Sequence, residues 1–172
     1  SAAARRTTGA SATGRRRAAP PAANALSAYL PSHLLPALRG FEGEFRKVAV
    51  LFLELRGQAL TALQAWYLSL CEVLDRYEGL LLKTDLSTAG SKWICLFGVP
   101  QVHEEDPDRA SRAALDVIRA TPKRLAVRGG LHAGTVANVI VGTKSRRSFD
   151  VMGDAVNAAA RALCKAPWGE VL

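Results

Sequence analysis

Apolar positions along the chain follow two periods, and each period predicts a different kind of element. An unbroken apolar run at 48–53 is typical of a strand that is covered on both faces. From Leu60 to Tyr77 the apolar residues instead recur every three or four positions, which predicts one buried face of a long helix. Gly79 follows at a place where a helix commonly ends. This part of the chain therefore predicts a strand followed by a helix.

The same two periods continue to the end of the chain. They predict further strands at 80–84, 93–97, 125–131, 136–141 and 149–151, and further helices at 107–120 and 154–165. The order is β-α-β-β-α-β-β-β-α. Its first six elements suit an antiparallel sheet with both helices on one face, the split βαβ arrangement. We therefore expect an α+β protein with a ferredoxin-like core. Because this fold serves many functions, the function has to be argued from a site.

Positive charge is concentrated at the start of the chain. The net charge is +8, and six of the 23 basic residues precede Glu42, the first of the 15 acidic residues. Residues 1–24 are mostly Ala, Arg, Pro, Gly, Ser and Thr, which predicts a disordered tail. We interpret 25–45 as a lead-in segment and 46–172 as one domain. The tail arginines suit contact with nucleic acid or an anionic membrane, but the composition favours a solvated linker.

Two features limit the cellular setting. No apolar run approaches the roughly 20 residues that a membrane helix needs, so we expect no membrane span in this segment. Cys71, Cys95 and Cys164 lie far apart, and each falls in an apolar helix or strand pattern. We interpret them as buried free thiols rather than as metal ligands or a disulfide framework. These features predict a reducing, cytoplasmic compartment.

Six segments, in order along the chain, resemble one family of enzymes. They are RKVAVLFLELRG, YEGLLLKT, WICLFGVPQVHEEDPDRASRAALDVI, RGGLHAGTVANVIVG, SRRSFDVMGDAVNAAARAL and PWGEVL. Together they resemble the catalytic domain of class III adenylyl and guanylyl cyclases over nearly all of 46–172. The resemblance implies an enzyme in which the ribose 3′ oxygen attacks the α-phosphate of a purine nucleotide and pyrophosphate leaves. Such a site must hold the base, bind two metal ions and stabilise charge in the transition state.

Asn157 and Arg161 are the candidate catalytic residues. They lie four positions apart on the predicted last helix and therefore share a face. The resemblance implies that Asn157 orients the ribose and that Arg161 stabilises the α-phosphate in the transition state. A planar guanidinium suits this task because it donates two aligned hydrogen bonds to phosphate oxygens. The spacing alone favours the alternative that the two residues are surface positions on an Ala-rich helix.

Lys83 and Asp150 are the candidate base-binding residues. Adenine offers an acceptor at N1 and a donor at N6, and a Lys only donates while an ionised Asp only accepts. Guanine reverses this pattern, so ATP is the expected substrate and GTP is less favoured. The resemblance implies that Lys83 is the base-reading Lys and Asp150 its partner. The alternative is a Lys at a strand end and an Asp in a surface turn.

The metal positions depart from the family. Glu54 stands where the family has its first metal-binding Asp, and Mg²⁺ demands tight octahedral geometry that a longer side chain fits less well. In the family, the second Asp lies in a short Gly-Asp-Gly turn. Here the turn is the longer segment 85–91, whose closest match to that Asp is Ser91, with Asp85 nearby but out of register. Two-metal catalysis needs both carboxylates. We therefore expect Mg²⁺ or Mn²⁺ to be held mainly by a partner half.

This combination resembles the second, base-binding half of paired cyclases, and the loop after Lys83 resembles that of the bicarbonate-responsive soluble adenylyl cyclases. The resemblance implies a second cyclase domain as partner, in a homodimer, in a heterodimer or within the same chain. The main alternative is a catalytically inactive pseudocyclase with a regulatory or dimerisation role. A third alternative is an RNA-binding domain of the same βαββαβ order. That module needs exposed aromatic residues on its central strands, which 127–129 do not offer, so we expect no specific nucleic-acid partner.

Overall fold

A computed structural model describes residues 43–172 except 58, 88–89 and 144–145. The tail predicted at 1–24 and nearly all of the lead-in segment at 25–45 lie outside these residues. No helix in the described part of the chain is long and apolar enough to cross a membrane.

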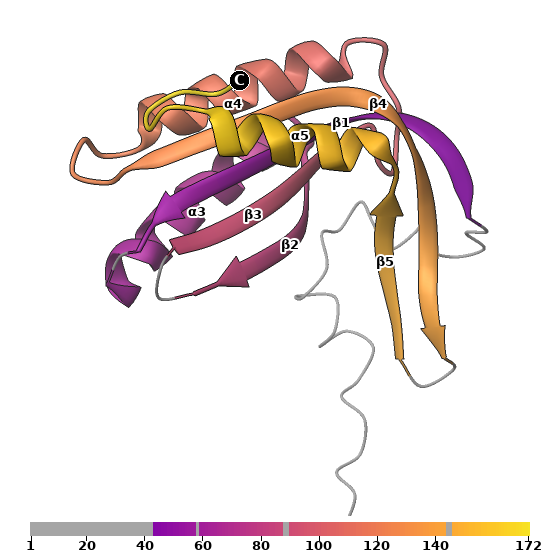
Figure 1. Cartoon of the computed structure of the whole chain (residues 1–172), viewed down its shortest axis with the longest axis horizontal. Coiled ribbons are helices and arrows are strands. Elements are labelled where there is room, and N and C mark those ends of the chain that lie inside the picture. The colour runs from indigo at the N-terminus through magenta and orange to yellow at the C-terminus, as the bar shows by residue number, and fades with distance from the viewer. Residues whose placement is uncertain (1–42, 58, 88–89, 144–145) are drawn as a thin grey trace, which may run out of the picture.

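The described residues form a five-stranded antiparallel sheet with three helices, which confirms the predicted α+β fold (Figure 1). In chain order the elements are β1 (Glu44–Arg56), α3 (Leu60–Arg76), β2 (Leu80–Leu86), β3 (Gly90–Phe97), α4 (Asp106–Ala120), β4 (Val127–Thr143), β5 (Arg146–Met152) and α5 (Asp154–Lys165). Across the sheet the strand order is β2-β3-β1-β4-β5, so β2 and β5 are the two edge strands.

The prediction of separate strands at 125–131 and 136–141 is wrong, because β4 runs through both as one strand of 17 residues. Gly134, which lies between the two predicted strands, pairs with Val48 in the middle of an unbroken ladder. Its missing side chain has another use. A Cβ at this position would lie 3.0 Å from the Cβ of Ala155, so the glycine allows α5 to approach the sheet.

The two faces of the sheet are covered by different helices. Alternate residues of β1, such as Leu51 and Leu53, pack against α3 and α4 in the larger core. The intervening residues, such as Val48 and Val50, face the opposite side, where Ala155 and Ala159 of α5 pack with them. The expectation of two helices on one face therefore applies to α3 and α4, and α5 lies on the other face (Figure 1).

The last residues of the described chain lie beside β4. After α5 the chain turns, and the amide of Gly129 donates to the carbonyl of Glu170 at 2.9 Å. The amide of Leu131 likewise donates to the carbonyl of Leu172 at 2.7 Å. This segment therefore pairs with the first half of β4, whereas β5 pairs with the second half.

Candidate active site

The structure brings the two predicted base-binding residues into direct contact. Lys83 and Asp150 are 67 positions apart in the sequence, and Lys83 Nζ donates to Asp150 Oδ2 at 2.6 Å. Lys83 lies on β2 and Asp150 on β5, the opposite edges of the sheet. The contact is possible because β4 bends sharply and carries β5 round toward β2 (Figure 1). The curled sheet therefore assembles a pair that a flat sheet would hold far apart.

A β-bulge decides which way Lys83 faces. The β2–β3 register shifts between Leu81 and Lys83, so that Leu81 pairs with Cys95 and Lys83 pairs with Ile94. In an unbroken ladder Lys83 would lie opposite Trp93 and face the buried core under α3. The extra residue in the bulged strand moves Lys83 to the same face as Ile94 and α5.

The Lys83–Asp150 pair keeps hydrogen-bonding capacity for a ligand. The ammonium group has three donors and uses one on Asp150. The Asp150 carboxylate also accepts a bond from the amide of Val151 to Oδ1 at 2.8 Å, which orients it. A carboxylate has about four acceptor positions, so further bonds remain possible. The Lys83 side chain is 49% exposed and that of Asp150 is 21% exposed, so solvent reaches both.

Asn157 and Arg161 share the outward face of α5. The helix buries Ala155, Ala159 and Leu163 against the sheet, and Asn157 and Arg161 are exposed. A groove of about 450 Å³ on this face is lined by Asn157, Ala160, Arg161, Cys164 and Lys165. The Arg161 guanidinium is 3.8 Å from the Asp154 carboxylate, and its side chain is 64% exposed. Both predicted catalytic residues are therefore accessible to a ligand, and neither Lys83 nor Asp150 lines this groove.

The expectation that all three cysteines are buried holds fully for Cys95 alone, since Cys71 is half-buried and Cys164 is exposed beside Arg161. The apolar pattern of α5 allowed either orientation, and the packing of Leu163 turns Cys164 outward. Cys95 is fully buried, and burial raises the pKa of its thiol above the usual range.

The Glu54 carboxylate is paired with a cation on the neighbouring strand. Glu54 Oε2 accepts a hydrogen bond from Arg128 Nε at 2.8 Å, and the same oxygen lies 2.6 Å from Arg128 Nη2. In the sheet Glu54 lies between Lys92 on β3 and Arg128 on β4. Its nearest charged neighbours across the strands are therefore cations, which repel a divalent metal ion.

A second metal-binding carboxylate is not supplied by Asp85 or Ser91. Asp85 pairs with Lys92, so a whole strand separates it from Glu54, roughly 10 Å at the usual strand spacing. Paired catalytic ions lie only about 3.5–4 Å apart. Ser91 is buried opposite Leu55, on the other face of the sheet from Glu54. Among the described residues no three His, Cys, Asp or Glu side chains gather in a way that could hold a metal ion.

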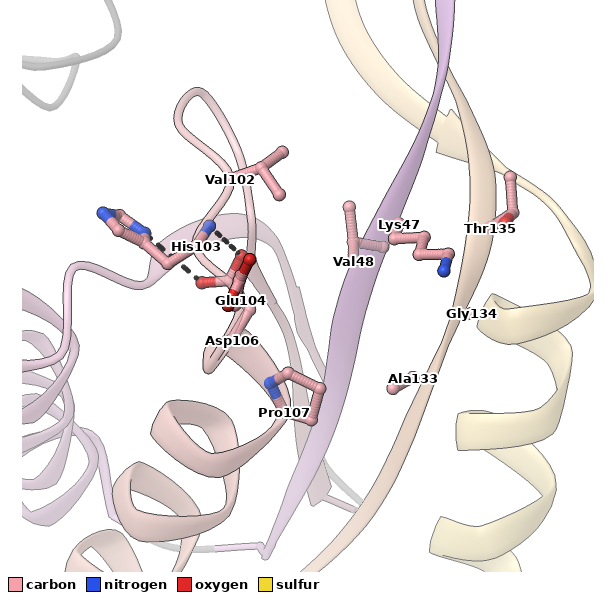
Figure 2. Close-up of a pocket in the computed structure, with 10 residues that line it drawn as sticks. All are labelled: Lys47, Val48, Val102, His103, Glu104, Asp106, Pro107, Ala133, Gly134 and Thr135. Atoms are coloured by element: carbon pink, nitrogen blue, oxygen red, sulfur yellow. Dashed lines mark hydrogen bonds and ion pairs between the residues drawn. The ribbon is translucent and has the colours of Figure 1, made fainter.

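A separate pocket of about 590 Å³ lies between the start of α4 and strands β1 and β4 (Figure 2). Its lining residues include none of the predicted site residues. On its wall, Asp106 accepts a hydrogen bond from the amide of His103 at 2.8 Å and pairs with Arg109 at 3.0 Å. These contacts anchor the start of α4, so Asp106, its first residue, has a structural role.

Sequence reasoning missed three residues around Glu54. Lys92 and Arg128 flank it across the sheet, and the ring of Trp168 lies 4.6 Å from the Arg128 guanidinium carbon. The signal that could have found them is the strand register, which places 92 and 128 opposite 54. A single sequence does not reveal that register.

Comparisons with known proteins concern the family and the fold. The chain matches the family described as "Adenylate and Guanylate cyclase catalytic domain" over residues 44–172. It is 30% identical over 143 residues to adenylate cyclase type 10 of Rattus norvegicus, which covers 76% of this chain and 9% of that protein. The chain thus spans about a tenth of the length of such curated relatives.

Solved structures share the fold. The catalytic core of a rhodopsin-guanylyl cyclase with converted specificity, in complex with ATPαS, has a TM-score of 0.64 at 23% identity, covering 76% of this chain and 78% of that one. The adenylyl cyclase CyaB from P. aeruginosa has a TM-score of 0.65 at 18% identity, covering 76% and 78%. At these identities the likeness concerns the fold alone.

Proposed function

The chain belongs to the adenylate and guanylate cyclase catalytic domain family, and from this premise we propose that it is an adenylyl cyclase domain supplying the base-binding half of a two-domain site. The observation that carries the proposal is the contact of Lys83 with Asp150 across the curled sheet. The reaction would convert ATP to cyclic AMP and pyrophosphate, in cyclic nucleotide signalling.

Adenine specificity is supported by the donor and acceptor that this pair presents. The remaining N–H groups of Lys83 can donate to adenine N1, and the free positions of the Asp150 carboxylate can accept from N6. Guanine would set its own donor against Lys83 and its acceptor against Asp150. Each polar group that a bound base covers and leaves mispaired costs about 1–3 kcal/mol, which disfavours GTP.

The outward face of α5 supplies the groups for the chemical step. The 3′ oxygen of the ribose loses its proton and forms a bond to the α-phosphorus, while the bond to pyrophosphate breaks. Negative charge grows on the α-phosphate oxygens during this step. The exposed guanidinium of Arg161 suits that charge, and Asn157, one turn earlier, suits hydrogen bonding to the ribose.

The half-site role is supported by the surroundings of Glu54. Cyclases of this family are generally metal-dependent, and the ion-paired Glu54 does not fit a two-metal site. A second cyclase domain that carries both metal-binding carboxylates would complete the site, either in another chain or elsewhere in the same one. The same observation favours the alternative of an inactive pseudocyclase, whereas the accessible Asn157 and Arg161 favour the enzyme.

A reconstitution experiment tests the proposal. The chain would be mixed with a cyclase domain that has both metal-binding Asp residues and Ala at its own catalytic Asn and Arg positions. We expect cyclic AMP from the mixture with Mg²⁺ or Mn²⁺ and ATP, and only background from either domain alone. Turnover of ~1–10³ per second by the chain alone would contradict the half-site role. An inactive mixture in which the two domains bind each other would support the pseudocyclase instead.

In the active mixture, Lys83→Glu tests the base-reading assignment. The ratio of kcat/KM for ATP to that for GTP should fall by roughly 5- to 150-fold, as expected for mispaired polar groups. Lys123→Glu is the matched control, because it reverses the charge of an exposed lysine in the turn after α4. An unchanged ratio in Lys83→Glu would show that this residue does not read the base.

A further inference from the structure

We infer that Glu54 is a positioning residue for helix α5, acting through Arg128, and that it is not a metal ligand. The catalytic consequence rests on the proposed function, because α5 carries Asn157 and Arg161. The contact itself is a property of the chain alone and can be tested without activity.

The first half of the link is a close ion pair between two neighbouring strands. Glu54 on β1 and Arg128 on β4 lie directly opposite each other in the ladder. Nε and Nη2 of Arg128 lie 2.8 and 2.6 Å from Glu54 Oε2. The side chains are only 22% and 16% exposed, so solvent screens the pair less than a surface pair. Charge-assisted bonds of this kind are about twice as strong as neutral ones.

The second half of the link joins Arg128 to the end of α5. Nη1 of Arg128 donates to the carbonyl of Ala166 at 3.3 Å, and Ala166 is the C-cap residue of the helix. The last carbonyls of a helix lack partners within it and carry partial negative charge. A cation held there by Glu54 therefore stabilises both the helix terminus and its place on the sheet.

The guanidinium also holds the chain that follows α5. Arg128 lies 4.6 Å and Arg56 lies 4.8 Å from the centroid of the Trp168 ring. Cation–π contacts of this geometry are attractive, and they favour the flat guanidinium over an ammonium group. One side chain, Arg128, thus connects β1, the C-cap of α5 and the segment that pairs with β4.

A row of alternating charges explains why a metal ion is excluded. Asp85, Lys92, Glu54 and Arg128 follow one another across β2, β3, β1 and β4 on one face of the sheet. Each carboxylate therefore has a cation as its neighbour, and opposite charges directly across strands attract. An ion at Glu54 would have to displace Arg128 and lie next to Lys92. The negative charge of Glu54 is thus balanced by Lys92 and Arg128, without a metal ion.

The position of α5 matters for the proposed reaction. Its backbone packs so closely on β4 that a Cβ at Gly130 would be 2.1 Å from the amide nitrogen of Leu163. Arg128 is two residues away on the same face of the strand and holds the next turn of the helix. A misplacement of about 1 Å in a reacting group can cost roughly 100-fold in rate. Loosening this end would therefore displace Arg161, which lies in the same last turns.

Glu54→Asp distinguishes the two roles, because they predict opposite effects. Asp is the residue that the family uses for metal, so a metal ligand should tolerate or gain from the change. A positioning residue should lose, because the shorter side chain does not reach Arg128. Glu54→Gln is the second variant, and Glu72→Gln on the exposed side of α3 is the matched control.

Hydrogen exchange of the whole chain measures the contact directly. We expect the amides of 163–166 and 169–172 to exchange roughly tenfold faster or more in Glu54→Asp and Glu54→Gln, and to be unchanged in Glu72→Gln. Arg128→Lys should resemble the Glu54 variants, since a lysine keeps the charge without the planar contacts. Unchanged exchange in the Glu54 variants would overturn the inference.

Manganese dependence provides a readout that distinguishes positioning from metal binding. In the reconstituted mixture, kcat should fall by roughly 10- to 100-fold in Glu54→Asp, with the Mn²⁺ concentration for half-maximal rate unchanged. Direct Mn²⁺ titration of the chain should give the same isotherm for wild type and Glu54→Gln. A half-maximal Mn²⁺ concentration that rises in Glu54→Gln, or Mn²⁺ binding that this variant abolishes, would overturn the inference. Exchange and Mn²⁺ binding need no turnover, so a failure of the proposed function would appear separately, as an inactive wild-type mixture.

Discussion

Individual side chains of the candidate site differ in how many hydrogen bonds and ion pairs they already make within the protein. Asp150 is held by Lys83 and by the amide of Val151, and Glu54 is held by Arg128. Arg161, in contrast, has one long contact of 3.8 Å to Asp154 among the described residues, and its side chain is 64% exposed. A group that is to meet charge arising during a reaction should be free in this way before the substrate binds.

Arg161→Ala should therefore lower turnover much more than nucleotide affinity. A group that meets charge present only in the transition state raises kcat without tightening the ground state. Loss of one such donor typically costs ~10²–10³ in kcat. The measurement is kcat and KM of the reconstituted mixture, with Arg119→Ala, an exposed arginine of α4, as control. If kcat holds while KM rises, Arg161 only binds the nucleotide.

At the scale of elements, the contact between α5 and β4 positions the site. Gly130 and Gly134 lie on the face of β4 that α5 covers, four residues apart. At Gly130 the helix backbone itself is in contact, whereas at Gly134 the neighbour is the side chain of Ala155. The two glycines thus set how near α5 lies to the sheet, and the first leaves no room for adjustment.

Gly130→Ala should destabilise the protein far more than Gly134→Ala. The new methyl group would lie 2.1 Å from the Leu163 nitrogen and 2.3 Å from the Ala159 carbonyl oxygen, so α5 must move. We expect a loss of at least about 3 kcal/mol in the free energy of unfolding, at the upper end of overpacking costs. At Gly134 the contact of 3.0 Å is with a side chain, and the loss should be about 1 kcal/mol. Urea unfolding of both variants measures this, and equal losses would show that α5 can shift.

For the molecule as a whole, the larger core between the sheet and helices α3 and α4 contains ionisable groups that are held neutral. Burial raises the pKa of the Cys95 thiol, with a smaller contribution from Cys71. Burial also raises the pKa of Cys71 and of Tyr67. All three shifts have the same sign, so they act together on the pH dependence of folding.

The free energy of unfolding should fall as the pH rises above about 8.5. Below that value the thiol is neutral in both states, and the stability it contributes is fully present. Above it, the unfolded thiol ionises while Cys95 in the folded protein stays neutral, which costs up to about 1.4 kcal/mol per pH unit for this group. Urea unfolding between pH 7 and pH 10 measures the slope. Cys95→Val should make it shallower and Cys164→Ser, an exposed thiol, should not. Identical slopes for wild type and Cys95→Val would contradict this assignment.

Local patterns were enough to predict the helices and to name candidate site residues. The breakers Pro167 and Gly169 predicted an end of the last helix at Lys165, as the structure has it. The spacing of Asn157 and Arg161 placed them on one helix face, and both line the groove on α5. Six segments in order along the chain carried enough resemblance to name the family, which the match over 44–172 confirms. Such features are local, because helix periodicity and short motifs depend only on neighbouring residues.

Gly134 shows where local reasoning was insufficient. A glycine inside an apolar run indicates either a turn or a close approach of another element, and only the position of α5 decides between them.

The pairing register between strands that are distant in the sequence decided which residues surround Glu54 and Lys83. Alternation along a strand indicates which residues share a face, but not which residue of the next strand lies opposite. The sequence therefore did not predict Lys92 and Arg128 as neighbours of Glu54, and only the pairing of β1 with β3 and β4 shows them to be so. The bulge before Lys83 and the bend of β4 are likewise properties of the folded sheet. The sequence alone thus determined the family and the candidate residues. Tertiary structure decided that Lys83 meets Asp150 and that Glu54 is committed to Arg128, because cross-strand contacts depend on pairing between distant segments.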